Sequence, residues 1–295
     1  MIIKKSFGET LFDIFNYFGM ALICLIVVFP FWSQLVTSIS GGYEAYESPL
    51  MFFPKSISFN AYVVLFQFPT IWVGYMNSII RTIIGTILST FFTALTAYPL
   101  SKKNLPFCNA VTMMLLFTML FSAPLIPRYL LVKNLGMLNS MPALVIPNMI
   151  AAWNVFIVRN FFRSIPESLE ESAIMDGAGR MRVFLQIVLP LSVPVIATIA
   201  LWSAVDNWNE WFSAMLYIHE MKKQVLQIVF REFVLLNRQT NVTSIITEMN
   251  NQGRFTSSKQ IESTAIMMSV LPMIIIYPFI QKHFVKGIMV GSIKG

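Results

Sequence analysis

Six long stretches without a charged residue constrain the fold of this chain more than any other feature. Each is apolar and approaches the ~20 residues that a helix needs to cross a hydrocarbon core of about 30 Å. Of the 295 residues, 56% are hydrophobic and 12% are charged, whereas soluble domains have about 25% charged residues. Because the stretches are long and do not alternate, they exclude a membrane barrel. We predict an all-α integral membrane protein with spans near residues 17–39, 80–101, 107–127, 141–161, 190–211 and 262–281.

A seventh charge-free interval, residues 56–80, is not expected to cross the membrane. Serine, asparagine, glutamine, threonine and proline are scattered through it. We interpret it as an interfacial segment that leads into the second span. A seventh span would also place the two chain termini on opposite sides of the membrane.

Basic residues flank the spans unevenly, and this asymmetry predicts the orientation. Six spans leave residues 1–16 as a cytoplasmic N-terminus, make residues 17–295 the transmembrane domain, and put both termini inside. The positive-inside rule then makes one face cytoplasmic, and we interpret the net charge of +7 as membrane anchoring rather than nucleic-acid binding. The basic residues on that face are Lys4, Lys5, Lys102, Lys103, Arg159, Arg163, Arg180, Arg182, Lys282, Lys286 and Lys294.

The loop at residues 162–190 is the most charged connection between spans and is predicted to form a cytoplasmic helix–turn–helix. Ser164 and Glu167 have the spacing of a capping box, which marks the start of a helix. Gly177 stands where a left-handed residue ends helices, so the first helix should end just before it. A second helix should lead into the fifth span, which Pro190 can begin.

The first helix of this loop is predicted to carry an acidic face beside an apolar stripe of Leu169 and Ala173. Small side chains at positions 172 and 173 allow close approach by a partner. Two interpretations stay open, a solvated amphipathic loop and a docking surface for another protein. Residues three or four positions apart share a helix face, which groups Glu167, Glu170, Glu171 and Ile174.

The same loop resembles a known family motif. The string E-E-S-A-x-x-D-G-A, with I-x-L-P ten residues on, is similar to the EAA loop of binding-protein-dependent ABC importers, with Ser172 in place of the first alanine. The likeness is strongest to the second permease of the carbohydrate-uptake branch, of the maltose, alginate and oligosaccharide type. Other segments that resemble this branch are residues 77–78, 97–103, 125–137, 208–217 and 286–295.

The resemblance implies a type I importer fold with six transmembrane helices, in a bacterial cytoplasmic membrane. Residues 165–178 would form the coupling helix, which transmits the motion of a cytoplasmic ATPase. Because this chain has no G-x-x-x-x-G-K-[ST] motif, ATP and Mg would be bound by separate ATPase subunits, and this chain would bind no cofactor. The expected coupling residues are Glu170, Glu171, Ser172, Ala173, Asp176, Gly177 and Ala178.

The resemblance also implies partners and a cargo. A companion permease subunit, two ATPase subunits and an extracytoplasmic solute-binding protein are expected. The cargo would be a carbohydrate, most simply an oligosaccharide, neutral or acidic. The long segment at residues 212–260 would face the solute-binding protein.

A polar and aromatic cluster at the end of the fifth span is a candidate substrate site. Sugars bind hydrogen-bonding side chains beside aromatic faces, but tryptophan also collects at membrane interfaces. Arg81 lies near the predicted outer boundary of the second span, where snorkelling is one interpretation. The sharper hypothesis is that Arg81 pairs with an acid of the cluster, Asp206 or Glu210, or attracts an anionic sugar. The cluster consists of Asp206, Asn207, Trp208, Asn209, Glu210 and Trp211.

Two other classes of function are weighed against the importer. A self-contained secondary transporter would need ion-coupling carboxylates near mid-membrane, and the predicted spans have none near their centres. A membrane-embedded glycan enzyme would need paired acids or a metal cluster, and only Asp206 with Glu210 offers a weak candidate. The cysteines and histidines lack the spacing of metal ligands, so no metal site is expected.

Overall fold

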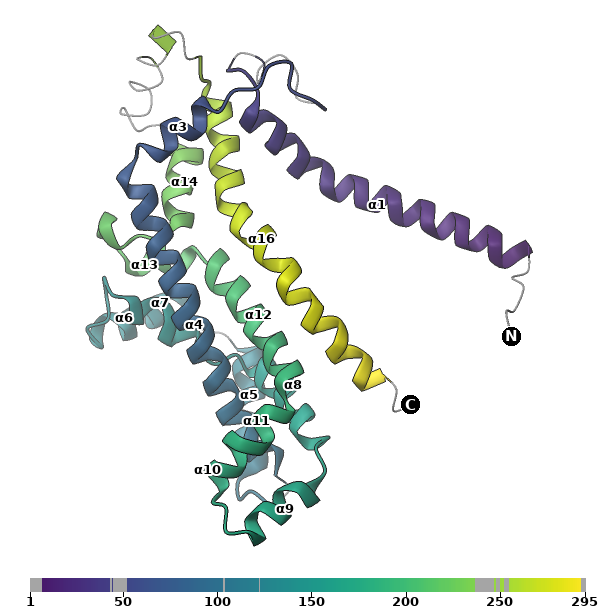
Figure 1. Cartoon of the computed structure of the whole chain (residues 1–295). Coiled ribbons are helices and arrows are strands. Elements are labelled where there is room, and N and C mark those ends of the chain that lie inside the picture. Colours follow the sequence, from purple (N-terminus) through teal and green to yellow (C-terminus); the bar gives the residue numbers. More distant parts are fainter. Residues whose placement is uncertain are drawn as a thin grey trace. The chain divides into compact units, whose positions relative to one another are not determined.

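The described part of the chain is built almost entirely from helices (Figure 1). A computed structural model describes residues 7–42, 44, 52–102, 104–121, 123–236, 247, 250–251 and 255–292. Lys4, Lys5, Lys103 and Lys294 lie outside these residues, as does part of the 212–260 segment. The helices are α1 (Phe7–Ile39), α3 (Asn60–Phe66), α4 (Pro69–Ser101), α5 (Cys108–Leu120), α6 (Leu125–Asn134), α7 (Met141–Val145), η1 (Ile146–Asn148), α8 (Ala152–Arg163), α9 (Glu167–Met175), α10 (Arg180–Val183), η2 (Phe184–Val188), α11 (Leu189–Leu191), α12 (Val193–Asn209), α13 (Phe212–Tyr217), η3 (Met221–Lys223), α14 (Leu226–Leu236) and α16 (Ser258–Ser292).

The chain divides into two compact units. Unit 1 comprises residues 1–69 and 230–270, and unit 2 comprises residues 70–229 and 271–295. In unit 1 the start of α16 is tied to the end of α1. Gln260 donates from Nε2 to the carbonyl oxygen of Ser40 at 2.7 Å, and Thr264 donates from Oγ1 to that of Ser38 at 3.4 Å. These buried bonds satisfy carbonyl groups that the end of α1 leaves without a helical partner.

Length and composition give up to six membrane-spanning segments in the described residues. Three helices qualify alone, namely α1, α4 and residues 258–276 of α16. Three further segments qualify only as bent pairs, α5 with α6, α7–η1 with α8, and α10–α11 with α12. The number of spans reaches six when each pair is counted as one. How many cross the bilayer, and in which orientation, stays a prediction.

Two helices begin earlier than the predicted spans. Helix α1 begins at Phe7 rather than near 17, and α4 begins at Pro69 rather than near 80. Polar residues of α4 that suggested an interfacial segment bond instead within unit 2. Asn77 donates from Nδ2 to the carbonyl oxygens of Lys222 and Gln224 at 3.2 and 2.9 Å. Because these partners lie about 145 residues away in sequence, local composition could not indicate them.

The later start of the predicted span also misplaced Arg81. Its residue is 1% exposed and lies well inside α4 rather than at a helix boundary. The snorkelling interpretation is therefore wrong. A buried guanidinium needs fixed partners, because its desolvation is costly without them.

Breaks interrupt the segments that were predicted as continuous spans. The residues 141–148 and α8 meet at 54°, and the α10–α11 segment meets α12 at 83°. Ser192 lies at the second break, and Pro194 occupies the first turn of α12, where its missing N–H costs nothing. Pro190 was predicted to begin this span, but it lies in α11 before the break. Proline supplies the physical cause, because it cannot continue the hydrogen-bond ladder of the preceding turn.

Unit 2 is organised around α4, which runs alongside α12 (Figure 1). A buried apolar core joins α4, α8, the α10–η2 segment and α12. Helices α4 and α12 also touch through polar groups, since Ser89 Oγ lies 3.2 Å from Ser203 Oγ. Gly85 permits this approach, because a Cβ at that position would collide with the amide of Asn207. The core residues are Ala94, Ala97, Leu100, Val155, Val158, Phe162, Val183, Phe184, Val188, Val195 and Ile199.

Candidate functional site

The turn after α9 has the geometry that its sequence predicts. Gly177 has a φ of +85°. Its N–H donates to the carbonyl oxygen of Ile174 at 3.0 Å, and the N–H of Ala178 donates to that of Ala173 at 2.9 Å. These two bonds form a Schellman motif, and Ala173 and Ala178 both pack against the core of unit 2. The prediction of a left-handed glycine that ends this helix is confirmed.

The start of α9 differs from the predicted capping box. Pro166 is the residue that precedes the helix, and no side chain caps the first turn. Ser164 donates from Oγ to the carbonyl oxygen of Phe161 at 2.7 Å. The prediction that Ser164 caps α9 is therefore wrong, because this serine ends α8 instead.

Glu170 anchors α9 to the end of α4. It is 7% exposed, although the same helix face was expected to group it with exposed acids. Its carboxylate accepts a hydrogen bond from the Tyr98 hydroxyl at 3.1 Å and forms an ion pair with Lys102. The ammonium group of Lys102 also lies 4.7 Å from the centroid of the Tyr98 ring. The loop helix is thus fixed to a long helix of unit 2 by charge-assisted contacts.

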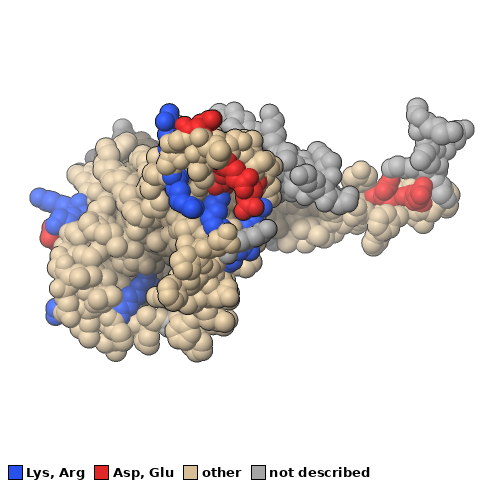
Figure 2. Space-filling model, turned by 90° about the horizontal axis from the view of Figure 1, so that it is seen from below, with Lys and Arg blue, Asp and Glu red and all other residues tan. Residues whose placement is uncertain are grey.

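The exposed residues of α9 and its C-terminal turn present acidic and apolar side chains to solvent. Figure 2 views the molecule from below and shows acidic and basic side chains gathered at this end. Among the apolar ones, Met175 is 87% exposed. We call this set the α9 surface, and it consists of Glu167, Leu169, Glu171, Ser172, Ile174, Met175 and Asp176.

The anchor gives a first testable prediction. Replacing Glu170 with glutamine should loosen the attachment of α9 to α4 and lower the stability of the purified protein, because it removes the charge from two hydrogen bonds worth about 1.5–3 kcal/mol each. The double exchange Lys102→Glu with Glu170→Lys should recover part of the loss. Thermal unfolding measures the change in stability, with Glu220→Gln as an exposed control. An unchanged unfolding temperature in Glu170→Gln would refute the anchor.

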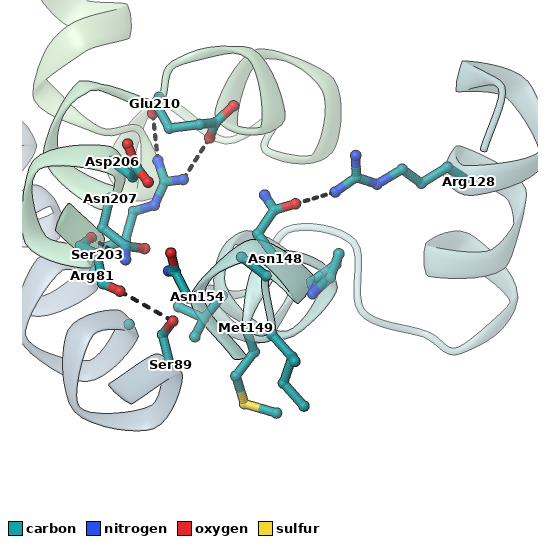
Figure 3. Close-up of a pocket in the computed structure, with 15 residues that line it drawn as sticks. Arg81, Ser89, Arg128, Asn148, Met149, Asn154, Ser203, Asp206, Asn207 and Glu210 are labelled. Carbon is teal, nitrogen blue, oxygen red and sulfur yellow. Dashed lines mark hydrogen bonds and ion pairs between the residues drawn. The ribbon is translucent and has the colours of Figure 1, made fainter. Parts of the chain in front are cut away.

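A polar cavity of about 520 Å³ lies within unit 2 (Figure 3). Residues of α4, α6, α7, η1, α8 and α12 line it, together with residues at the break before α8 and after α12. This volume falls in the range of small-molecule sites, and its lining is richer in polar groups than most. Its lining residues are Arg81, Gly85, Ser89, Arg128, Val145, Pro147, Asn148, Met149, Ile150, Ala151, Asn154, Ser203, Asp206, Asn207 and Glu210.

One wall of the cavity is held by a buried ion pair. Arg81 donates from one terminal nitrogen to the Glu210 carbonyl oxygen at 2.6 Å and from the other to Glu210 Oε2 at 2.5 Å. Glu210 also accepts from the backbone N–H of Ser213 at 2.7 Å. The pair therefore links α4 to the junction where α12 ends and α13 begins. The hypothesis that Arg81 pairs with an acid of the cluster is confirmed for Glu210.

The predicted polar and aromatic cluster is divided by the structure. Asp206, Asn207 and Glu210 line the cavity, whereas Trp208 is 5% exposed and, like Asn209 and Trp211, is not part of the lining. The consecutive residues could not all face one cavity, because a helix turns by about 100° per residue. The substrate role of the cluster stays a prediction.

Sequence reasoning missed several residues of the cavity wall. Asn148 and Asn154 lie within the predicted span 141–161, and Arg128 follows the predicted span 107–127. Polar residues inside an apolar stretch are themselves a signal of function. The two asparagines could have been found in this way.

The described residues thus form a helical protein with apolar helices long enough to cross a membrane, a polar cavity, and a separate loop helix with an exposed acidic and apolar surface. The family described as binding-protein-dependent transport system inner membrane component matches residues 105–290. The chain belongs to this family, whose members are permease subunits of ABC importers and not enzymes. It is thus an integral membrane component of a binding-protein-dependent transport system.

Similar proteins cover nearly the whole chain. The polygalacturonan/rhamnogalacturonan transport system permease protein YtcP of Bacillus subtilis is 38% identical over 97% of this chain and 99% of its own length. Protein LplC of the same organism is 38% identical over 96% of this chain and 95% of its own. The crystal structure of a bacterial ABC transporter that imports the acidic polysaccharide alginate contains a chain with 30% identity and a TM-score of 0.88, covering 95% of this chain and 99% of that one.

Proposed function

We propose that the unit 2 cavity is part of the route by which an oligosaccharide crosses the bacterial cytoplasmic membrane. The observation that carries the proposal is the polar lining of the cavity. Charged and amide side chains are energetically costly within an apolar bundle, so their presence there indicates a functional site. A companion permease would supply the remaining wall of the route. An extracytoplasmic binding protein would deliver the saccharide.

The α9 surface is the proposed contact with a cytoplasmic ATPase subunit. Exposed Met175 and Glu171 offer an apolar and an acidic contact, while Glu170 fixes α9 to the end of α4 through its ion pair with Lys102. Motion of the ATPase would then pass through α9 to α4 as a rigid connection. ATP and Mg would be bound by the ATPase subunits, since this chain has no phosphate-binding loop motif.

An acidic oligosaccharide is the cargo that we propose. The importer whose chain is 30% identical to this one carries alginate, which is described as an acidic polysaccharide. Two arginines line the cavity. Glu210 neutralises Arg81, whereas Arg128 forms no ion pair with a carboxylate among the described residues. A self-contained secondary transporter is less well supported, because the family depends on a binding protein.

Charge reversal on the α9 surface tests the coupling proposal. Glu171→Lys should abolish copurification of the ATPase subunit with this chain, because it places a cation where the surface is acidic. Glu220→Lys, which changes an exposed acid outside α9, is the matched control. Both variants should insert into the membrane equally well. Retention of the ATPase and of full saccharide uptake by Glu171→Lys would show that α9 is not the contact.

A further inference from the structure

The cavity of unit 2 has two ends of opposite charge (Figure 3). At one end Arg81 and Glu210 neutralise each other, so the carboxylate of Asp206 leaves a net negative charge. Arg128 lies on the other side of the cavity, where its guanidinium donates one hydrogen bond to Asn148 Oδ1. Among the described residues Arg128 has no carboxylate partner. Its charge and its remaining N–H groups are therefore available to a ligand.

The first turn of α8 adds positive potential to the cavity. Ala151 precedes this helix and offers no side-chain cap for its free N–H groups. Ile150, Ala151 and Asn154 all line the cavity, so the start of α8 borders it directly. The free N–H groups of a helix N-terminus carry a partial positive charge and favour an anion.

Asn154, which lies toward Ser203 and Asn207 in Figure 3, supplies an independent sign that a polar ligand enters the cavity. It is 8% exposed and lines the cavity, yet its side-chain amide has no hydrogen-bond partner among the described residues. Buried polar side chains are nearly always hydrogen-bonded in folded proteins. Because the amide borders an open space of about 520 Å³, a bound molecule can satisfy it.

We propose that Arg128 forms a subsite for a carboxylate of the transported saccharide, and that Asn154 and the uncapped start of α8 bind other polar groups of the same molecule. This inference rests on the proposed function and assigns the acid recognition to particular residues. A planar guanidinium matches a carboxylate through two parallel hydrogen bonds, and the amide of Asn154 can bind a hydroxyl group of the sugar. The Arg81 guanidinium is not part of the subsite, because Glu210 already occupies it.

The opposite end of the cavity sets the orientation of the sugar. Asp206 repels a carboxylate but accepts hydrogen bonds from hydroxyl groups, as does the amide oxygen of Asn207. A uronic acid residue therefore binds with its carboxylate toward Arg128 and its hydroxyls toward Asp206. A neutral sugar loses the ionic contact and keeps the hydroxyl contacts, so the subsite discriminates by charge.

The test compares two saccharides of the same length and linkage. Trigalacturonate and its carboxyl-reduced neutral counterpart are given to the complete importer in proteoliposomes, and KM and kcat of uptake are measured for each. Arg128→Gln should raise KM for trigalacturonate about tenfold and change KM for the neutral trisaccharide less than twofold, because a charge-assisted bond is lost only for the acid. For Arg128→Lys, KM for trigalacturonate should lie between the values for the wild type and Arg128→Gln. Lysine keeps the positive charge but lacks the planar guanidinium that binds a carboxylate through two parallel hydrogen bonds.

Two further variants control the result. Asn154→Leu should raise KM for both trisaccharides about threefold without affecting copurification of the subunits. Lys133→Gln removes a cation from the same helix outside the cavity and should leave both saccharides unaffected. Equal losses for the acidic and the neutral trisaccharide in Arg128→Gln would overturn the subsite and leave the permease function standing. A wild-type importer that prefers the neutral trisaccharide would also overturn the subsite, whereas one that carries neither would overturn the proposed function.

Discussion

Replacing Gly177 with valine is expected to lower saccharide uptake at least about tenfold while the protein still inserts into the membrane. The φ of +85° at this position costs an L-residue about 1–2 kcal/mol, and a β-branched side chain tolerates it least. No atom lies within 4 Å of the added Cβ, so the backbone alone carries the strain. The two hydrogen bonds of the Schellman motif should break, and the end of α9 should lose its fixed direction.

Gly179 provides the matched control for this prediction. It lies two residues further along, has an ordinary φ of −69°, and also has open space around an added Cβ. Gly179→Val should therefore keep most of the uptake, and Gly177→Asn should keep more than Gly177→Val because asparagine tolerates a positive φ. Uptake and ATP hydrolysis are measured together on the purified importer. Equal effects at positions 177 and 179 would contradict a role for the turn.

Features that depend on local chemistry could be predicted from the sequence. Apolar stretches of sufficient length indicate membrane helices whatever their neighbours are, because the bilayer requires internal hydrogen bonding. The left-handed conformation of Gly177 could also be predicted, because the positive φ depends only on the backbone of its own turn. The pairing of Arg81 with an acid of the cluster, in contrast, was only one of two interpretations, and its partner Glu210 lies 129 residues away.

Features that depend on distant partners could not be predicted in this way. The early start of α4 is stabilised by contacts of Asn77 with carbonyl groups about 145 residues away. The inward position of Glu170 depends on Tyr98 and Lys102, and its helical spacing gave no sign of them. Spacing along a helix defines which residues share a face but not which face is buried.

The breaks in the candidate membrane segments could be predicted only in part. Prolines near Asn148 and Ser192 were visible in the sequence, but proline and glycine are common in membrane helices and do not by themselves indicate a break. The break before α8 opens the cavity to Asn148 and exposes the first turn of that helix. Part of the candidate site therefore lies at a break whose position only the structure reveals.

Replacing Glu210 with glutamine is expected to destabilise the purified importer more than replacing Arg81 with glutamine. The side chain of Arg81 is 2% exposed, whereas that of Glu210 is 29% exposed and borders the cavity. Loss of Glu210 leaves a buried guanidinium without its counter-charge, which costs about 3–5 kcal/mol in comparable pairs. Loss of Arg81 leaves a carboxylate that water in the cavity can partly hydrate and that Ser213 still binds.

The double variant Arg81→Gln with Glu210→Gln should be more stable than Glu210→Gln alone, because no uncompensated charge remains in the bundle. Thermal unfolding of the complex in detergent gives the three free energies and their coupling in a double-mutant cycle. The exposed pair of Lys223 and Glu220, whose side chains are 48% and 54% exposed, should show a coupling below about 1 kcal/mol under the same conditions. Additive effects at positions 81 and 210 would mean that their ion pair does not hold α4 to the end of α12. A strong coupling would instead identify this pair as the support on which Asp206 and the acid end of the cavity depend.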